Sequence, residues 1–194
     1  MENRARLQDF IHSFTQLIER VGSDEASIFT DGKALLSTLI GHDDWLPHEF
    51  ARPSPDGYRQ YLLYCDPLER FSVVSFVWAP EQTTPVHDHT VWGMVGVLRG
   101  AERCEEYELD PANARLRATG SHELPVGAVD LVSPRIGDIH RVSNALEDGV
   151  SISIHVYGGN IGAVQRHVYD VDTGVKKPFV SGYSKRGVAL GDTC

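Results

Sequence analysis

Residues 85–100, PVHDHTVWGMVGVLRG, place two histidines directly before a run of apolar residues. In an extended chain, residues two apart point to the same side, so His87 and His89 can face one point while Asp88 faces away. Residues 91–98 have the apolar character of a buried β-strand. The pattern predicts a β-structure that presents two imidazoles together at the start of a strand.

A third histidine lies in SPRIGDIHRVSN, residues 133–144. Pro134 and Gly137 predict a tight turn that delivers His140 at the head of the next strand. Three neutral imidazoles leave open positions on a metal ion, which catalytic sites require and structural sites avoid. We therefore predict that His87, His89 and His140 bind a metal ion. Imidazole suits iron, copper, nickel and zinc alike, so these residues alone do not select the metal.

Upstream of these motifs the pattern is helical. Apolar residues recur at spacings of three and four over residues 7–21, which predicts an amphipathic helix. A second helix is expected to begin near Asp31, as its N-cap, and to end at Gly41. The stretch ARPSPDG, residues 51–57, then predicts a loop. We expect residues 1–50 to be a helical segment packed on a barrel formed by residues 51–194, within one domain.

After the loop, short β-type runs are separated by turn residues. They are RQYLLYC (59–65), RFSVVSFVW (70–78), VWGMVGVLRG (91–100), RCEEYEL (103–109), ARLRAT (114–119), GAVDLVS (127–133), VSISIHVYG (150–158) and RHVYDVD (166–172). Many short strands in series indicate a mainly β protein, an antiparallel barrel or sandwich, and not βαβ units. The tail after Phe179 is expected either to extend loosely or to wrap the barrel.

One of these runs has two different faces. Ser153, His155 and Tyr157 alternate with aliphatic residues in SISIHVY, residues 151–157. If the aliphatic face packs under the helices, the three polar side chains face the barrel interior; otherwise they face water. The chain has no GxSxG motif, so the row is not the nucleophile and base of a serine hydrolase.

Composition limits the partners. The chain has 194 residues, 41% hydrophobic and 23% charged, which suits a single core. Its net charge of -9 and the absence of basic clusters argue against nucleic acid or membrane as a partner. The cysteines, Cys65, Cys104 and Cys194, form no CxxC pair, which favours a reducing compartment. With no signal-peptide pattern at the start, we expect a cytoplasmic protein. The oligomeric state stays open.

The two histidine segments resemble the two cupin motifs, and the resemblance implies a cupin, or jelly-roll, β-barrel. Many cupins carry a glutamate ligand where this chain has Gly93. The lack of that ligand resembles the three-histidine cupins, of which the cysteine dioxygenase family of thiol dioxygenases is the best known. The row Ser153, His155 and Tyr157 is similar to the proton relay of these enzymes. The resemblance implies one iron(II) per chain, with O2 as co-substrate.

The same resemblance bears on the substrate. Mammalian-type cysteine dioxygenases hold the substrate carboxylate with an arginine where this chain has Gln60, and form a crosslink from a cysteine where it has Gly93. The glutamine resembles the bacterial 3-mercaptopropionate dioxygenase branch, in which an arginine after the relay tyrosine binds the carboxylate. Arg166 matches that place, and Arg59 is a weaker competitor.

The resemblance thus implies an iron(II) thiol dioxygenase that converts a small thiol carboxylate to a sulfinate, with 3-mercaptopropionate favoured. Ser153, His155 and Tyr157 would be catalytic, and Arg166, Tyr157 and Gln60 would bind the substrate. L-Cysteine is the competing substrate. The histidine pattern also fits a non-catalytic cupin that binds a metal or a small ligand, and a zinc-dependent cupin isomerase.

Overall fold

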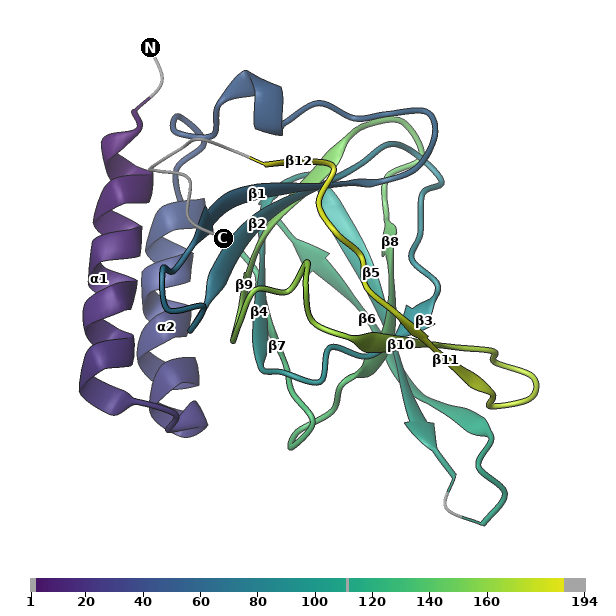
Figure 1. Ribbon diagram of the computed structural model, residues 1–194. Coiled ribbons are helices and arrows are strands. Elements are labelled where there is room, and N and C mark those ends of the chain that lie inside the picture. Colours follow the sequence, from purple (N-terminus) through teal and green to yellow (C-terminus); the bar gives the residue numbers. More distant parts are fainter. Residues whose placement is uncertain (1–2, 111, 187–194) are drawn as a thin grey trace.

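The computed structural model describes residues 3–110 and 112–186, which form two helices against two facing β-sheets (Figure 1). The helices are α1 (Ala5–Val21) and α2 (Glu25–Ile40), followed by the short 3-10 helix η1 (His48–Phe50). The strands are β1 (Arg59–Cys65), β2 (Ser72–Trp78), β3 (Val86–His87), β4 (Gly93–Arg99), β5 (Ala101–Leu109), β6 (Leu116–Pro125), β7 (Val129–Val132), β8 (Ile139–Asn144), β9 (Ser151–Tyr157), β10 (Arg166–Tyr169), β11 (Lys176–Phe179) and β12 (Lys185–Arg186).

The strands form two six-stranded sheets, in the orders β12-β1-β2-β9-β4-β7 and β11-β10-β3-β8-β5-β6. Neighbouring strands are antiparallel, except that β12 runs parallel to β1. Consecutive strands alternate between the two sheets at several points, which is how a jelly roll closes around one interior. The expected mainly β cupin barrel with N-terminal helices is confirmed.

The helices cover the outer face of the sheet that contains β9 (Figure 1). Their apolar side chains join those of β1, β2, β4 and β9 in one buried cluster. On β9 the members of this cluster are Ile152, Ile154 and Val156. Because side chains alternate along a strand, the other face of β9 points into the barrel. The helices therefore determine which face of β9 is available to a site.

The first helix was predicted well, but the predicted start of the second was wrong. It begins after Asp24, and Asp31 lies inside it. The sequence Asp31-Gly32 looked like a helix boundary, but Gly32 serves close packing. A Cβ atom at this position would lie 2.9 Å from the Phe14 ring and 3.0 Å from the Met94 methyl group. The end at Gly41 is confirmed.

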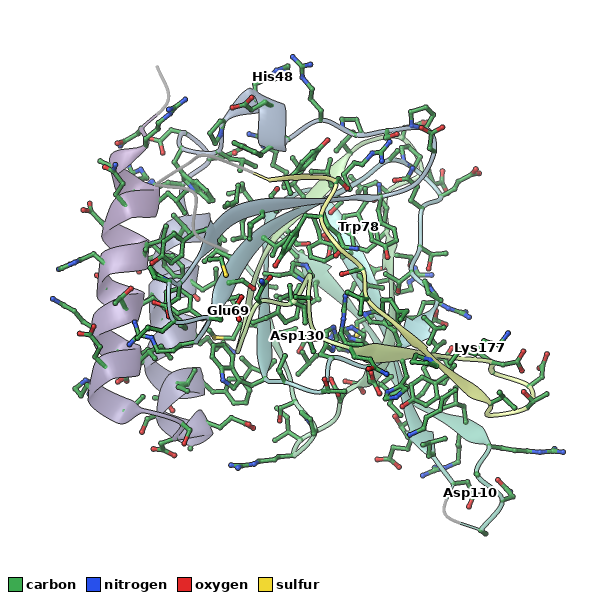
Figure 2. The ribbon with its side chains drawn as sticks, viewed as in Figure 1. His48, Glu69, Trp78, Asp110, Asp130 and Lys177 are labelled. Carbon is green, nitrogen blue, oxygen red and sulfur yellow. The ribbon has the colours of Figure 1, made fainter. Side chains whose placement is uncertain are left out.

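The strand pattern was largely recovered, with β1 found over the residues expected for it. The short strand β3 and the strand β11 were missed. Part of the tail does wrap the barrel, because the backbone of β12 pairs with β1. Away from the helices, Figure 2 shows Asp110 near the tip of the β5–β6 hairpin.

The cysteines differ from one another. Cys104 is a buried free thiol, whereas Cys65 is disulfide-bonded. The expectation of reduced cysteines was therefore wrong for Cys65, and Cys194 lies outside the described residues. Neither α1 nor α2 has the length and hydropathy of a helix that crosses a bilayer.

The contact between the helices and the sheet should be a main source of stability. Phe14 is fully buried, and its ring lies 4.9 Å from that of Phe71 and 5.5 Å from that of Phe10, measured between centroids. Phe14→Ala should lower the free energy of unfolding by about 3–5 kcal/mol, because it leaves a cavity between the layers. Leu68→Ala, at a side chain that is 73% exposed, is the control and should change it by less than about 0.5 kcal/mol. Urea unfolding followed by circular dichroism measures both, and equal effects would contradict the assignment.

Candidate metal centre

The three predicted histidines meet inside the barrel. His87 ends β3, His89 follows it, and His140 on β8 is the direct cross-strand partner of His87. All three are buried, and each pair of rings has a centroid separation of 4.9 Å. Their candidate ligand nitrogens all lie within 4.8 Å of one another. The fold thus brings together a three-histidine group from two segments far apart in the sequence.

The second nitrogen of each ring has its own partner. Nδ1 of His87 lies 3.0 Å from the Pro85 carbonyl oxygen, and Nδ1 of His89 lies 2.9 Å from Oδ1 of Asp138. Nδ1 of His140 lies 3.5 Å from the Cys104 sulfur. A carbonyl or carboxylate oxygen accepts a hydrogen bond, so the ring proton sits on Nδ1 and the Nε2 lone pair is left for a metal. At His87 and His89 the fold thus favours the tautomer that leaves Nε2 available to an ion.

Asp138 is a functional residue that the sequence reasoning missed. Besides the His89 ring, its carboxylate accepts the backbone N–H groups of His89 and Thr90, at 2.9–3.1 Å. Burial raises the pKa of Asp138, but the hydrogen bonds and the charge interaction with His89 outweigh it, so the pKa is lowered. A carboxylate behind a ligating histidine orients the ring and increases its basicity. The only local signal was an aspartate two residues before His140.

Burial also keeps two of the histidines, His87 and His140, neutral. Removal from water lowers the pKa of His87 to about 3, and the nearby His89 adds to the effect. The same desolvation lowers the pKa of His140 well below its usual value. Neutral imidazole is the form that ligates metals, so no deprotonation is needed at these two residues near neutral pH.

Next to this group, the polar face of β9 forms a hydrogen-bonded row. Oγ of Ser153 lies 2.7 Å from Nε2 of His155, and Nδ1 of His155 lies 2.7 Å from Oη of Tyr157. The Tyr157 ring stacks on that of His89, with 5.3 Å between centroids. Burial lowers the pKa of His155 and raises that of Tyr157. The row leads from the interior to the edge of the three-histidine group.

The Tyr157 ring leaves no room for a side chain at position 93, which is a glycine. Gly93 is the cross-strand partner of Tyr157, and a Cβ atom there would lie 2.8 Å from Cδ1 of the tyrosine ring. Real Cβ contacts are not that short, so neither a glutamate ligand nor a cysteine fits beside the tyrosine in this position.

Arg166, at the start of β10, is 3% exposed. Its Nη2 donates to Oγ of Ser181 at 2.7 Å, and its guanidinium lies 4.7 Å from the centroid of the Phe179 ring. Within the described ranges, its Nε has no hydrogen-bond partner, and its guanidinium forms no ion pair. Arg166 interacts electrostatically with His87 and Tyr157. A buried cation thus lies beside the centre with part of its hydrogen-bonding capacity unused.

The other predicted substrate residues separate into two environments. Oε1 of Gln60 is buried and lacks a hydrogen-bond partner among the described residues, and its side chain contacts Tyr58, which also interacts with Arg166. Arg59, the competitor of Arg166, bonds instead to Ser54 and lies 3.4 Å from Asp56. The structure therefore brings Gln60 and Arg166 into one region and places Arg59 outside it.

Asp88 faces away from the metal group, as expected. Its carboxylate accepts the backbone N–H of His167 at 2.7 Å, bonds the His167 ring at 2.9 Å and accepts the Tyr169 hydroxyl at 2.8 Å. These bonds fix β10 against β3. The middle residue of the His-Asp-His segment thus holds the strand that begins with Arg166.

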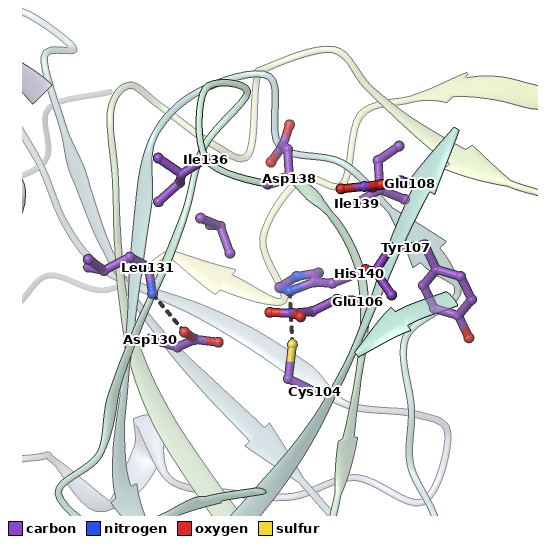
Figure 3. A pocket seen from close by; sticks show the side chains of 13 residues that line it. Cys104, Glu106, Tyr107, Glu108, Asp130, Leu131, Ile136, Asp138, Ile139 and His140 are labelled. Atoms are coloured by element: carbon purple, nitrogen blue, oxygen red, sulfur yellow. Dashed lines mark hydrogen bonds between the residues drawn. The ribbon is translucent and has the colours of Figure 1, made fainter. Parts of the chain in front are cut away.

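A cavity of about 240 Å³ lies behind His140, on its Nδ1 side (Figure 3). Figure 3 shows the Cys104 sulfur joined to this ring by a hydrogen bond, with Asp130 to one side of both. Cys104, His122 and Asp130 form a second group of ligand atoms within 4.8 Å of one another. His122 and Asp130 already bond each other, at 3.0 Å. The second group is therefore a useful comparison for any metal measurement.

No family model matches the chain. Similar solved structures include a protein with a double-stranded β-helix domain from Klebsiella pneumoniae, with 20% identity over 62% of this chain and 95% of that chain and a TM-score of 0.45. An RmlC-like cupin from Desulfovibrio desulfuricans has 20% identity over 60% of this chain and 97% of that chain, with a TM-score of 0.44. An oxalate oxidase in complex with glycolate has 20% identity over 55% of this chain and 53% of that chain, with a TM-score of 0.43. Likenesses at this level carry no argument about activity. The chain's own strand order and histidines make it a cupin fold with a buried three-histidine group.

Metal affinity should depend on the carboxylate behind His89. Asp138→Asn should weaken iron(II) binding about 10- to 100-fold, because the ring loses its charged acceptor. Asp130→Asn, a matched change beside the second group, should leave the affinity within about twofold. Anaerobic competition with a coloured iron(II) chelator measures both. Weaker binding in Asp130→Asn alone would place the metal at the Cys104 group instead.

Proposed function

We propose that this protein is an iron(II)-dependent thiol dioxygenase that acts on a small thiol carboxylate, with 3-mercaptopropionate as the favoured substrate. The reaction is RSH + O2 → RSO2⁻ + H⁺, in which sulfur supplies all four electrons and no external reductant is used. His87, His89 and His140 would hold the metal through their Nε2 atoms, which the Nδ1 contacts of His87 and His89 leave available at those two rings. Bound iron(II) would supply the redox chemistry between oxygen and the thiolate.

The observation that carries the substrate class is the buried guanidinium of Arg166, which forms no close ion pair with any described residue and interacts with Asp88 only at longer range. A buried charge without a counter-ion is costly, and a site of this kind is stabilised when an anion enters it. A carboxylate matches the planar guanidinium and can accept two parallel hydrogen bonds. Arg166 would therefore bind the substrate carboxylate, and Gln60, which contacts Tyr58 next to Arg166, would line that end of the site together with Tyr157.

The carboxylates near the centre favour a substrate without an amino group. Asp138 is engaged by His89 and Thr90, and Asp88 by His167 and Tyr169. Neither is free to receive the ammonium group that L-cysteine would bring. 3-Mercaptopropionate has no such group and needs no acidic partner, which is why it is the favoured thiol.

The β9 row would handle protons. Tyr157 reaches the site, His155 bonds it at 2.7 Å, and Ser153 bonds His155 at 2.7 Å. Apolar side chains between the sheets surround the row and exclude water. In such a setting each polar contact is stronger than it would be in water. The chain's own residues would thus bind the carboxylate, orient the thiol toward the three histidines and hold a proton at Oη of Tyr157.

The function is tested by oxygen uptake of the iron-loaded protein with 3-mercaptopropionate and with L-cysteine, combined with product analysis. We expect one O2 consumed per thiol, a sulfinate product, and a higher kcat/KM for 3-mercaptopropionate. A higher kcat/KM for L-cysteine would overturn the substrate assignment. No oxygen consumption with either thiol would support a binding cupin instead.

The carboxylate site is tested by a matched pair of arginine variants. Arg166→Ala should lower kcat/KM for 3-mercaptopropionate about 30-fold or more, because a buried charge-assisted contact is lost. Arg59→Ala should change it by less than about threefold, since Arg59 is engaged by Ser54 and Asp56. If Arg59→Ala has the larger effect in the same assay, the carboxylate binds elsewhere.

A further inference from the structure

Glu102, on β5, is a carboxyl group inside the barrel that the proposed function does not use. It is fully buried. Its Oε1 accepts the Ser151 hydroxyl at 3.2 Å. Its Oε2 and the nearby Nε1 of Trp78 both lack a well-formed hydrogen bond within the described ranges. Buried carboxyl groups are rare without a full set of partners, so this one calls for an explanation.

The carboxyl lies at the far end of the β9 row. Burial raises the pKa of Glu102 to about 7, while hydrogen bonding by Ser153, Ser151 and Trp78 acts in the opposite direction. Ser153 is also the residue that bonds His155. The row of Tyr157, His155 and Ser153 therefore does not end at the serine, because a group that titrates near neutral pH lies next to it.

The directions of the hydrogen bonds follow from the charge of Glu102. When Glu102 is ionised, the Ser153 hydroxyl donates toward the carboxylate, Nε2–H of His155 donates to Ser153, and the Tyr157 hydroxyl donates to Nδ1 of His155. Every mobile proton then points toward Glu102. Moving each proton by one bond reverses the row and leaves Glu102 neutral.

We propose that Glu102 is the terminal proton acceptor of this row and takes up the proton that the thiol substrate loses when it binds. The proposal rests on the proposed function. The thiol proton goes to Oη of Tyr157, the tyrosine proton to Nδ1 of His155, the Nε2 proton to Ser153, and the serine proton to Glu102. The balance is RSH + Glu–COO⁻ → RS⁻ + Glu–COOH, with no oxidant or reductant.

The transfer prevents an additional negative charge from accumulating inside the barrel when the substrate binds. A thiol carboxylate that enters the barrel as a thiolate brings a second negative charge into a region of low dielectric. If Glu102 is protonated at the same time, the number of negative charges among these groups stays constant. The net change is the transfer of one proton from the thiol to Glu102, and this proton remains inside the barrel.

The other groups around Glu102 are unsuited to this role. Besides Ser151 and Ser153, its neighbours include the titratable Cys104 on β5 and Tyr157 on β9 and the neutral Trp78 on β2 and Asn144 on β8, while His155 lies one hydrogen bond further along the row. Burial and nearby carboxylates raise the pKa of Cys104, so its thiol stays protonated. Burial lowers the pKa of His155, so it passes a proton on and does not keep it.

Calorimetry tests the acceptor directly. 3-Mercaptopropionate is titrated anaerobically into the iron-loaded protein in two buffers of different ionisation enthalpy, which gives the number of protons released. At about pH 8 the wild type should release close to none, because ionised Glu102 retains the proton, and Glu102→Gln should release about one. At about pH 6, where Glu102 is already protonated, both should release about one.

The path is tested by the rate of anaerobic thiol capture in stopped flow, with two serine variants as a matched pair. Ser153→Ala removes the link between His155 and the carboxyl, and should slow capture at about pH 8 at least about tenfold. Ser151→Ala removes a hydrogen bond to Glu102 outside the row. It should keep rapid capture, with the pH midpoint moved upward because the carboxylate loses a donor.

The outcomes separate the two claims. If the thiol binds and the wild type and Glu102→Gln release the same number of protons at about pH 8, the inference is overturned while the proposed function stands. If no thiol binds to the iron-loaded wild type, the proposed function fails. Should Glu102→Gln not fold, the wild type alone decides, because proton release that does not change between about pH 8 and about pH 6 overturns the inference.

Discussion

The structure depends on one strand, β9, whose two faces need different surroundings, one apolar and one polar. Ile152, Ile154 and Val156 require an apolar layer, and α1 and α2 provide it. The period of two then forces Ser153 and its polar partners into the barrel. The helices pack closely on this sheet. Gly96 lets β4 approach α2, since a Cβ atom there would lie 3.0 Å from Ile40. Without the helices the aliphatic face of β9 would be exposed to water, and nothing would fix the polar row toward the barrel interior.

Inside the barrel, the unsatisfied polar atoms gather at the two ends of that row. The described residues contain four such buried side-chain atoms: Oε1 of Gln60, Nε of Arg166, Nε1 of Trp78 and Oε2 of Glu102. Nε of Arg166 lies near Tyr157, and the last two atoms lie at the Ser153 end. Gln60 contacts Tyr58, which interacts with Arg166 and also stacks on Trp78. Orphaned polar atoms are rare in folded proteins and often mark places where a ligand or a proton is exchanged. One end then suits an anion and the other a proton, which is the pair of needs that a thiol carboxylate brings.

Local periodicity was enough to predict the helices, most strands, the two histidines of residues 85–100 and the faces of β9. It was not enough where the reason for a residue lies far away in the sequence. The start of the second helix was misplaced at Asp31, which lies inside α2 and accepts a hydrogen bond from Arg20 of α1. Asp138 was missed because its bonds to His89 span 49 positions. Asp88 was correctly turned away from the metal group, but its role in fixing β10 depends on His167, 79 positions along the chain. Such contacts cannot be recognised in the local sequence pattern, because they form only when the two sheets have closed.

The two aspartates that flank the histidines show how the same chemistry serves two purposes. Asp138 binds the ring of His89 and sets the tautomer of a candidate ligand. Asp88, one residue away from that histidine, binds β10 and so sets the position of Arg166. His87, His89 and, through Asp88, the strand of the guanidinium are thereby positioned by one short segment, because successive side chains of an extended chain point to opposite sides. A shift of this segment would therefore move His87, His89 and β10 together.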